Sequence, residues 1–201
     1  MKKLVLLFVI MFKLAFASEE FRGSCRDAKL NIANFITASV GQLLTISKLR
    51  IAVEMQNAKL EKVIEDCTDV IKVSKRVLGR AKWNSLNDAQ QENFLKQYPI
   101  YFITVFRDIT LQALNGVKTF SFKPNGIENK YDIILEFYDK DKEPIIFTLR
   151  IEENDGYLKI TDGEFLGVSV VSSQRDMFDR LYSENPNSIK NFNFKQFSKN
   201  Q

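Results

Sequence analysis

The stretch GYLKITDGEFLGVSVVSSQRDMFDRLY, residues 156–182, decides how the chain closes on itself. Two short alternating runs, residues 157–161 and 164–168, flank Asp162-Gly163, a dipeptide typical of tight β-turns. The chain then passes through Gly167-Val168-Ser169 into a run with apolar residues at helical spacing. We therefore predict a strand pair that leads directly into a helix and packs that helix against its own sheet.

The chain before this corner divides into a helical half and a strand half. Helical spacing of apolar residues predicts a helix or a pair of helices over 26–46, and helices over 54–66 and 69–82. A further, highly apolar helix begins at Asn87, where Gln90 completes a capping-box pattern. Pro99 lies inside this last helix, and we expect it to kink or split the helix. Gly79, close to the end of the third helix, predicts a tight packing point.

From residue 118 onward the apolar period changes from helical to two, which is typical of half-buried antiparallel strands. Residues 140–142 and 154–156 read as hairpin turns. After the last strand we expect Ser172 or Ser173 to cap a helix, and Pro186 to open a final short one. The predicted fold is α+β: N-terminal helices, a curved antiparallel sheet of about five strands, and C-terminal helices, with an apolar cavity between helices and sheet.

The first seventeen residues have the pattern of an export signal. A basic start and an apolar run lead to the A-x-A site at 15–17, so we expect cleavage after Ala17 and a single domain over 18–201. A retained membrane anchor is the alternative, although the run is short for a bilayer span. Removing three of the 29 basic residues leaves 26 against 25 acidic ones, so the charge does not point to nucleic acid.

The composition limits the chemistry available. The chain contains no His, which removes Ser-His-Asp and Cys-His catalysis and the commonest metal ligand. We expect no catalytic residues, no metal and no cofactor. Turn chemistry explains the clustered carboxylates Asp155, Asp162 and Glu164 more simply than acid–base work does. Cys25 and Cys67 are the only cysteines, and an exported chain permits a disulfide between them, but the sequence leaves their pairing open.

The excess of large apolar residues is the feature with most functional content; Phe alone occurs 17 times. These residues lie on one face of the helix that begins at Asn87 and on one face of each strand. A filled core explains this pattern, and so does an apolar cavity between two layers, because periodicity does not separate the two. If the cavity exists, we predict that it is lined by Phe94, Tyr98, Phe102, Val105, Phe106, Ile133, Leu135, Phe137, Phe147 and Leu149. The opposite sheet face, with Ile134, Tyr138 and Ile146, is the alternative lining.

Two motifs resemble signatures of the MlaC family of periplasmic phospholipid-binding proteins, also called toluene-tolerance auxiliary proteins. The first is LGRAKWNSLNDAQQENF, residues 78–94. The second comprises YLKITD at 157–162, LGVS at 166–169 and QRDMF at 174–178. Tyr157 stands where the family usually has Trp, and Leu166 where it usually has Glu. The resemblance covers residues 67–182, with the segments in the expected order.

The resemblance implies a carrier without enzymatic activity. Such proteins hold phospholipid acyl chains between helices and a curved sheet and cross the periplasm with them. They exchange lipid with an inner-membrane ABC transporter complex and an outer-membrane lipoprotein–porin complex, which maintains outer-membrane lipid asymmetry. A structural or scaffolding component of a cell-envelope complex, with a filled core and no ligand, is the alternative. An enzyme on a similar fold is a more distant one.

Overall fold

The computed structural model describes residues 23–124, 129–138 and 143–193. Within these ranges, the description does not include the side chains of residues 104–120, 122–124 and 137–138. The expected signal segment and the expected hairpin turn at 140–142 lie outside the described residues.

The N-terminal half is helical, as predicted, but its first part is divided into short pieces. Ser24 caps the first piece: its Oγ accepts from the Asp27 N–H, and Asp27 accepts from the Ser24 N–H in return. Asn31 caps the second piece by accepting from the Asn34 N–H at 3.0 Å. The elements are α1 (Cys25–Ala28), α2 (Ile32–Ile36), a π-helical turn η1 (Thr37–Gly41), α3 (Gln42–Ser47) and α4 (Val53–Cys67).

A disulfide joins the first and last of these helices. Cys25 in α1 and Cys67 at the end of α4 are bonded, with their Cα atoms 5.1 Å apart. Both cysteines are buried, and the backbone N–H of Cys25 also donates to the Asp66 carboxylate. The pairing that the sequence left open is therefore present, and it ties the start of the described chain to the end of α4.

Helix α5 (Val70–Asn84) begins at Asp69, whose side chain accepts from the Lys72 N–H at 2.9 Å. Gly79 interrupts it with φ 71°, a conformation that favours glycine. A Cβ at Gly79 would lie 3.4 Å from Nη2 of Arg175, so the predicted close packing occurs at this position. Trp83, four residues later, is buried and has the Lys75 ammonium 5.5 Å from its ring centroid.

Helix α6 (Asp88–Gly116) has the predicted capping box. The Asn87 N–H donates to Gln90 Oε1 at 3.0 Å, and the Gln90 N–H donates to Asn87 Oδ1 at 2.9 Å. Of the two expected effects of Pro99, a kink or a split, the split was wrong, because the helix continues through this residue as one element; the kink stays a prediction. A proline removes one backbone donor, and the remaining bonds of a 29-residue helix are sufficient to hold it together.

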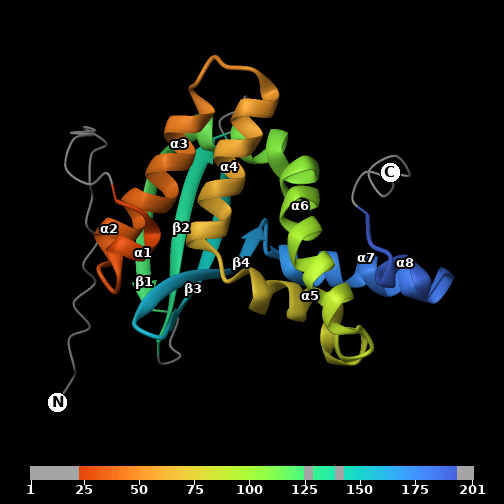
Figure 1. Cartoon of the computed structure of the whole chain (residues 1–201). Coiled ribbons are helices and arrows are strands. Elements are labelled where there is room, and N and C mark those ends of the chain that lie inside the picture. Colours follow the sequence, from red (N-terminus) through yellow and green to blue (C-terminus); the bar gives the residue numbers. More distant parts are fainter. Residues whose placement is uncertain (1–22, 125–128, 139–142, 194–201) are drawn as a thin grey trace.

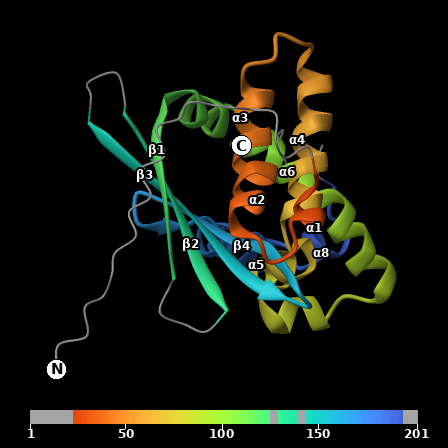
Figure 2. The same ribbon diagram turned by 90° about the vertical axis from the view of Figure 1, so that its left-hand side faces the viewer.

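The sheet follows in one meander and confirms the α+β prediction. All neighbouring strands are antiparallel and lie in sequence order. Helices α1–α4 cover one face of the sheet, and the C-terminal helices lie beyond β4, away from β1 (Figures 1 and 2). The strands are β1 (Val117–Pro124), β2 (Lys130–Tyr138), β3 (Pro144–Asn154), β4 (Tyr157–Phe165) and the two-residue β5 (Val168–Ser169).

The period-two alternation identified the buried face correctly. Ile133, Leu135 and Leu149 are buried against the N-terminal helices. Ile146, on the opposite face, is 50% exposed. The face preferred from the sequence is therefore the one that the helices cover.

The predicted turn at Asp162-Gly163 was wrong. Both residues lie inside β4, which runs unbroken to Phe165. Arg150 pairs with Asp162 while the next residue of β3 pairs with Ile160, so Thr161 is the extra residue of a β-bulge. Gly163 is required for space rather than for a turn, because a Cβ there would lie 3.0 Å from Cζ of Phe147.

The tight turns lie on either side of β4. Asp155 and Gly156 have φ 50° and 78°, which confirms the predicted turn before the strand. Leu166 and Gly167 have φ 50° and 80° and form the turn after it. Two successive residues at positive φ are the geometry that suits a two-residue hairpin between right-twisted strands.

The helix after β5 begins earlier than predicted. Helix α7 (Val170–Glu184) is capped by Ser169, whose Oγ accepts from the Ser172 N–H at 3.1 Å, and not by Ser172 or Ser173. The elbow itself is as expected, because a strand of two residues leads into the helix without a loop. The last helix, α8 (Asn187–Lys190), follows Pro186 as predicted.

The disulfide supports a prediction about stability. It closes a loop with a sequence separation of 42 residues, so its loss should lower the free energy of unfolding by roughly 2–4 kcal/mol. Urea unfolding with and without dithiothreitol measures this difference. The Cys25→Ser/Cys67→Ser double variant should unfold like the reduced protein and should not respond to dithiothreitol. Equal midpoints for oxidised and reduced protein would contradict the prediction.

Candidate functional site

The opening stretch is held by one buried carboxylate, Asp162. Its side chain has no exposed surface. It accepts from the Gly163 N–H at 2.8 Å, the Ser169 hydroxyl at 2.7 Å and the Val171 N–H at 3.1 Å. Asp162 thereby joins the bulge of β4 to the first turn of α7, where the helix dipole also favours a negative charge.

Two arginines from other elements compensate the charge of this carboxylate. Arg150 of β3 donates to Asp162 Oδ2 at 3.4 Å and pairs with Glu164 through its other terminal nitrogen. Arg76 of α5 lies 3.8 Å from the same oxygen and donates to the Thr161 carbonyl at 3.0 Å. A buried charge is tolerated when it is paired and hydrogen-bonded, and both conditions hold here.

This cluster corrects the sequence interpretation of the carboxylates. Asp155 does lie in a turn, but Asp162 and Glu164 are strand residues that bind arginines. The sequence did contain one indication of this pairing, because Arg150 is a charged residue in a predicted strand of the same sheet. The partner could not be chosen without the bulge, because the bulge sets which residue of β4 lies opposite Arg150.

The predicted lining residues of α6 pack into an aromatic cluster with the C-terminal helices. Phe94 stacks on Tyr98 with ring centroids 5.4 Å apart. Its ring also lies 5.5 Å from that of Phe178 in α7 and 5.1 Å from that of Phe192, which follows α8. Phe102 lies at the margin of the same cluster, 6.3 Å from Tyr98. Phe94 and Tyr98 are buried, so the space around them is occupied by other rings.

The predicted lining residues of the sheet lie in a different cluster. Ile133, Leu135 and Leu149 are buried, and Phe147 packs at their margin. Their cluster contains side chains from α1 to α4, including Phe35, Val40, Leu44, Leu60 and Val63. Ile103 of α6 belongs to this cluster as well, whereas Tyr101 belongs to the aromatic cluster, so α6 contributes to both clusters.

The two halves of the predicted lining are therefore not brought together among the described side chains. Phe94, Tyr98 and Phe102 belong to one cluster and the sheet residues to the other. The side chains of Val105, Phe106 and Phe137 lie outside the described residues. Because α6 passes from the aromatic cluster to the sheet cluster at Ile103, Val105 and Phe106 follow on the part of the helix beyond this point. The full lining stays a prediction.

Three buried polar atoms, one each on α5, α6 and α7, were not identified from the sequence. Within the part of the chain that the structure describes, Ser74 Oγ, Tyr98 Oη and Gln174 Oε1 are buried without a hydrogen-bond partner. Burial raises the pKa of the Tyr98 hydroxyl far above its ordinary value, and Tyr101 and Asp162 add to this shift. Tyr98 is therefore neutral at any physiological pH. The sequence did contain one indication of such an atom, because the hydroxyl of Tyr98 lies within the apolar stripe of α6.

Among the described residues, one group of side chains has the spacing of a metal site, but two of its members are bonded to each other. Cys25, Asp66 and Cys67 are the only three acidic, cysteine or histidine side chains in the described ranges that are close enough to share an ion. The two sulfurs form the disulfide, so neither is a free thiolate ligand. Across the same ranges, no helix combines the length and the apolar character that crossing a bilayer requires.

The fold is that of an α+β domain. Helices cover one face of an open antiparallel meander, and the charged bulge of β4 joins this sheet to a C-terminal helix. The sequence profile of the MlaC protein family matches residues 38–193. The chain therefore belongs to the MlaC family, as its two motifs indicated.

A solved structure has the same fold. It is a phospholipid-binding protein from Ralstonia solanacearum in complex with a phospholipid, determined at 1.53 Å. The TM-score is 0.63 at 16% sequence identity, and the match covers 75% of this chain and 87% of that chain. No curated protein sequence matches this chain.

The Asp162 cluster supports a second prediction about stability. Asp162→Ala would leave two arginines and the first turn of α7 without their common acceptor, so the free energy of unfolding should fall by roughly 2–4 kcal/mol. Chemical denaturation followed by circular dichroism measures the change. Asp176→Ala, on the exposed surface of α7, is the matched control and should change stability by less than about 0.5 kcal/mol. If the two variants are equally stable, Asp162 does not have the role assigned to it.

Proposed function

We propose that this protein is a phospholipid carrier of the bacterial periplasm. The observation that carries the proposal is membership of the MlaC family, together with a fold shared with a protein solved in complex with a phospholipid. The export signal expected at residues 1–17 agrees with a periplasmic location. In this proposal the acyl chains lie in an apolar pocket, and no residue of the chain performs catalysis.

We infer which part of the predicted lining contacts the acyl chains from how closely each part is packed. Phe94 and Tyr98 are held by rings of α7 and the segment after α8, so they support the helical layer rather than present free apolar surface. The helix-covered face of the sheet is the better candidate, because Phe147, which pairs with Leu135, is only half-buried at the margin of its cluster. We therefore place the acyl chains against β2 and β3, between the sheet and the helices that cover it.

The energetics of acyl chains dictate how such a carrier must work. Each buried CH₂ contributes about 0.8 kcal/mol, so two chains of ~30 methylenes together represent roughly 24 kcal/mol of gross transfer from water. Spontaneous release into water is therefore negligible, and the lipid must pass directly to a docked partner. We propose an inner-membrane ABC transporter complex and an outer-membrane lipoprotein–porin complex as these partners, with maintenance of outer-membrane lipid asymmetry as the result.

Co-purification of lipid tests the proposal. Native mass spectrometry of gently purified protein should show a bound phospholipid, and extraction should release an equivalent amount of lipid phosphorus. A clean unliganded mass in every preparation would contradict the carrier function and favour the scaffolding alternative. That alternative instead predicts a stable, stoichiometric protein partner.

A pair of tryptophan variants tests the position of the lipid. Leu135→Trp adds volume to the helix-covered face of the sheet and should lower the bound lipid several-fold by occupying the space of the acyl chains. Ile146→Trp adds the same group to the opposite, exposed face and should retain lipid like the unmodified protein. Circular dichroism confirms that both variants fold, because overpacking a core costs typically 1–3 kcal/mol. Full lipid content in a folded Leu135→Trp protein would show that the acyl chains do not lie against this face of the sheet.

A further inference from the structure

The loop between α3 and α4 forms one end of the described structure. In both ribbon views it projects beyond the strands and beyond the other helices (Figures 1 and 2). We call residues 48–55 the apical segment; it comprises this loop and the start of α4. A projecting, convex segment can reach a flat surface before any other described part of the molecule does.

The apical segment exposes large apolar side chains. Leu49 is 36% exposed, Val53 49% and Met55 57%. The other large hydrophobic residues exposed in the described ranges are Leu30 after α1, Ile71 of α5, Ile146 of β3, and Leu166 and Val168 around the β4–β5 turn. Three such residues within one short projecting segment are a local concentration of apolar surface, and such a concentration often marks an interaction site.

This exposure does not arise from a loosely held loop. The Lys48 N–H donates to the Thr45 carbonyl at 3.2 Å, and the Leu49 N–H donates to the Ile46 carbonyl at 3.1 Å. The buried Gln56 reaches across from α4 and donates from Nε2 to the same Ile46 carbonyl at 3.0 Å. The two helices are thereby fastened together directly below the apex, and the apolar side chains are held outward.

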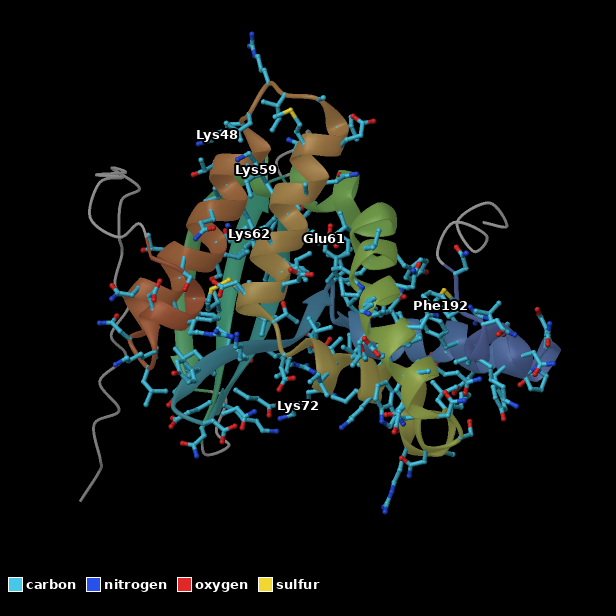
Figure 3. The ribbon with its side chains drawn as sticks, in the orientation of Figure 1. Lys48, Lys59, Glu61, Lys62, Lys72 and Phe192 are labelled. Atoms are coloured by element: carbon cyan, nitrogen blue, oxygen red, sulfur yellow. A yellow bond between two sulfur atoms is a disulfide. The ribbon has the colours of Figure 1, made fainter. Side chains whose placement is uncertain are left out.

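Basic residues surround the exposed apolar ones. Lys48 and Arg50 lie within the apical segment, and Lys59 lies about one turn further along α4; all three are exposed. Figure 3 shows Lys48 at the α3 side of the apex and Lys59 on α4. Glu54 is the acidic residue among them. The first turn of α4 has no side-chain cap, so its backbone N–H groups add positive potential at the same place.

We propose that the apical segment binds the surface of a membrane that contains anionic phospholipid. Leu49, Val53 and Met55 would enter the boundary between head groups and acyl chains, while Lys48, Arg50 and Lys59 would contact lipid phosphates. A convex apex of separate apolar side chains between cations suits a lipid surface better than a protein groove. The inference concerns a surface outside the acyl-chain region, and it does not depend on lipid being carried inside the protein.

Vesicle sedimentation tests the apolar part of the inference. The exported, processed protein should sediment with vesicles of equal parts phosphatidylglycerol and phosphatidylcholine. It should bind vesicles of phosphatidylcholine alone several-fold more weakly. Met55→Asp should lower binding to the anionic vesicles by about tenfold or more. Ile71→Asp is the matched control, because Ile71 is 53% exposed on α5, away from the apex, and it should bind like the unmodified protein.

A charge reversal tests the basic part. Arg50→Glu should lower binding to the anionic vesicles by about tenfold, and high salt should lower the binding of the unmodified protein. Arg180→Glu makes the same change on the exposed side of α7 and should have little effect. All four variants change exposed side chains, and circular dichroism checks that each is folded.

Three results would overturn the inference. One is equal sedimentation of the unmodified protein with anionic and neutral vesicles, and another is equal binding by the apical variants and their controls. The third is an absence of vesicle binding while the apical variants lose lipid exchange with a membrane complex, which would assign the apex to a protein partner. Lipid phosphorus is measured on the same preparations. It reports whether the protein carries lipid, independently of whether it binds vesicles.

Discussion

The buried carboxylate of Asp162 is the interaction on which the arrangement of the layers depends. It binds the first turn of α7, the bulge of β4, Arg150 of β3 and Arg76 of α5. Four elements therefore meet at one charge. Its two oxygens accept from the backbone donors and from Arg150 and pair with Arg76. A buried charge is tolerated in a protein interior when it is paired and hydrogen-bonded in this way.

Two apolar clusters lie on either side of this junction. One is formed by the sheet and the N-terminal helices and is closed by the Cys25–Cys67 disulfide. The other is formed by α5, α6 and the C-terminal helices, and it is dominated by aromatic rings in mutual contact. Helix α6 belongs to both. This division gives the protein an aromatic half and a separate sheet-lined half, which is the half that we assign to lipid.

Local chemistry was a reliable guide at several places where the relevant partners are close in sequence, although it misplaced the N-cap of α7 and the turn at Asp162-Gly163. The Asn87–Gln90 capping box and the turn at Asp155-Gly156 were predicted correctly, because each is formed within a few residues. The buried face of the sheet was also predicted correctly, since alternate residues of a strand must point to opposite faces. The predicted lining is not one surface: its sheet residues lie on the face that the helices cover, whereas Phe94 and Tyr98 pack in the aromatic cluster, so the lining as a whole stays a prediction.

The sequence by itself determined the element types, their order, the buried side of the sheet and, through two motifs, the family. Periodicity and short-range hydrogen bonds carry this information, and both act over a few residues. Only the tertiary structure decided that Cys25 pairs with Cys67 and that Asp162 is a buried arginine partner rather than a turn residue. The same residue types suit a hairpin turn and a bulged strand. The choice between them depends on contacts with Arg150, Arg76 and the Phe147 ring, which are distant in sequence and meet only when the layers pack.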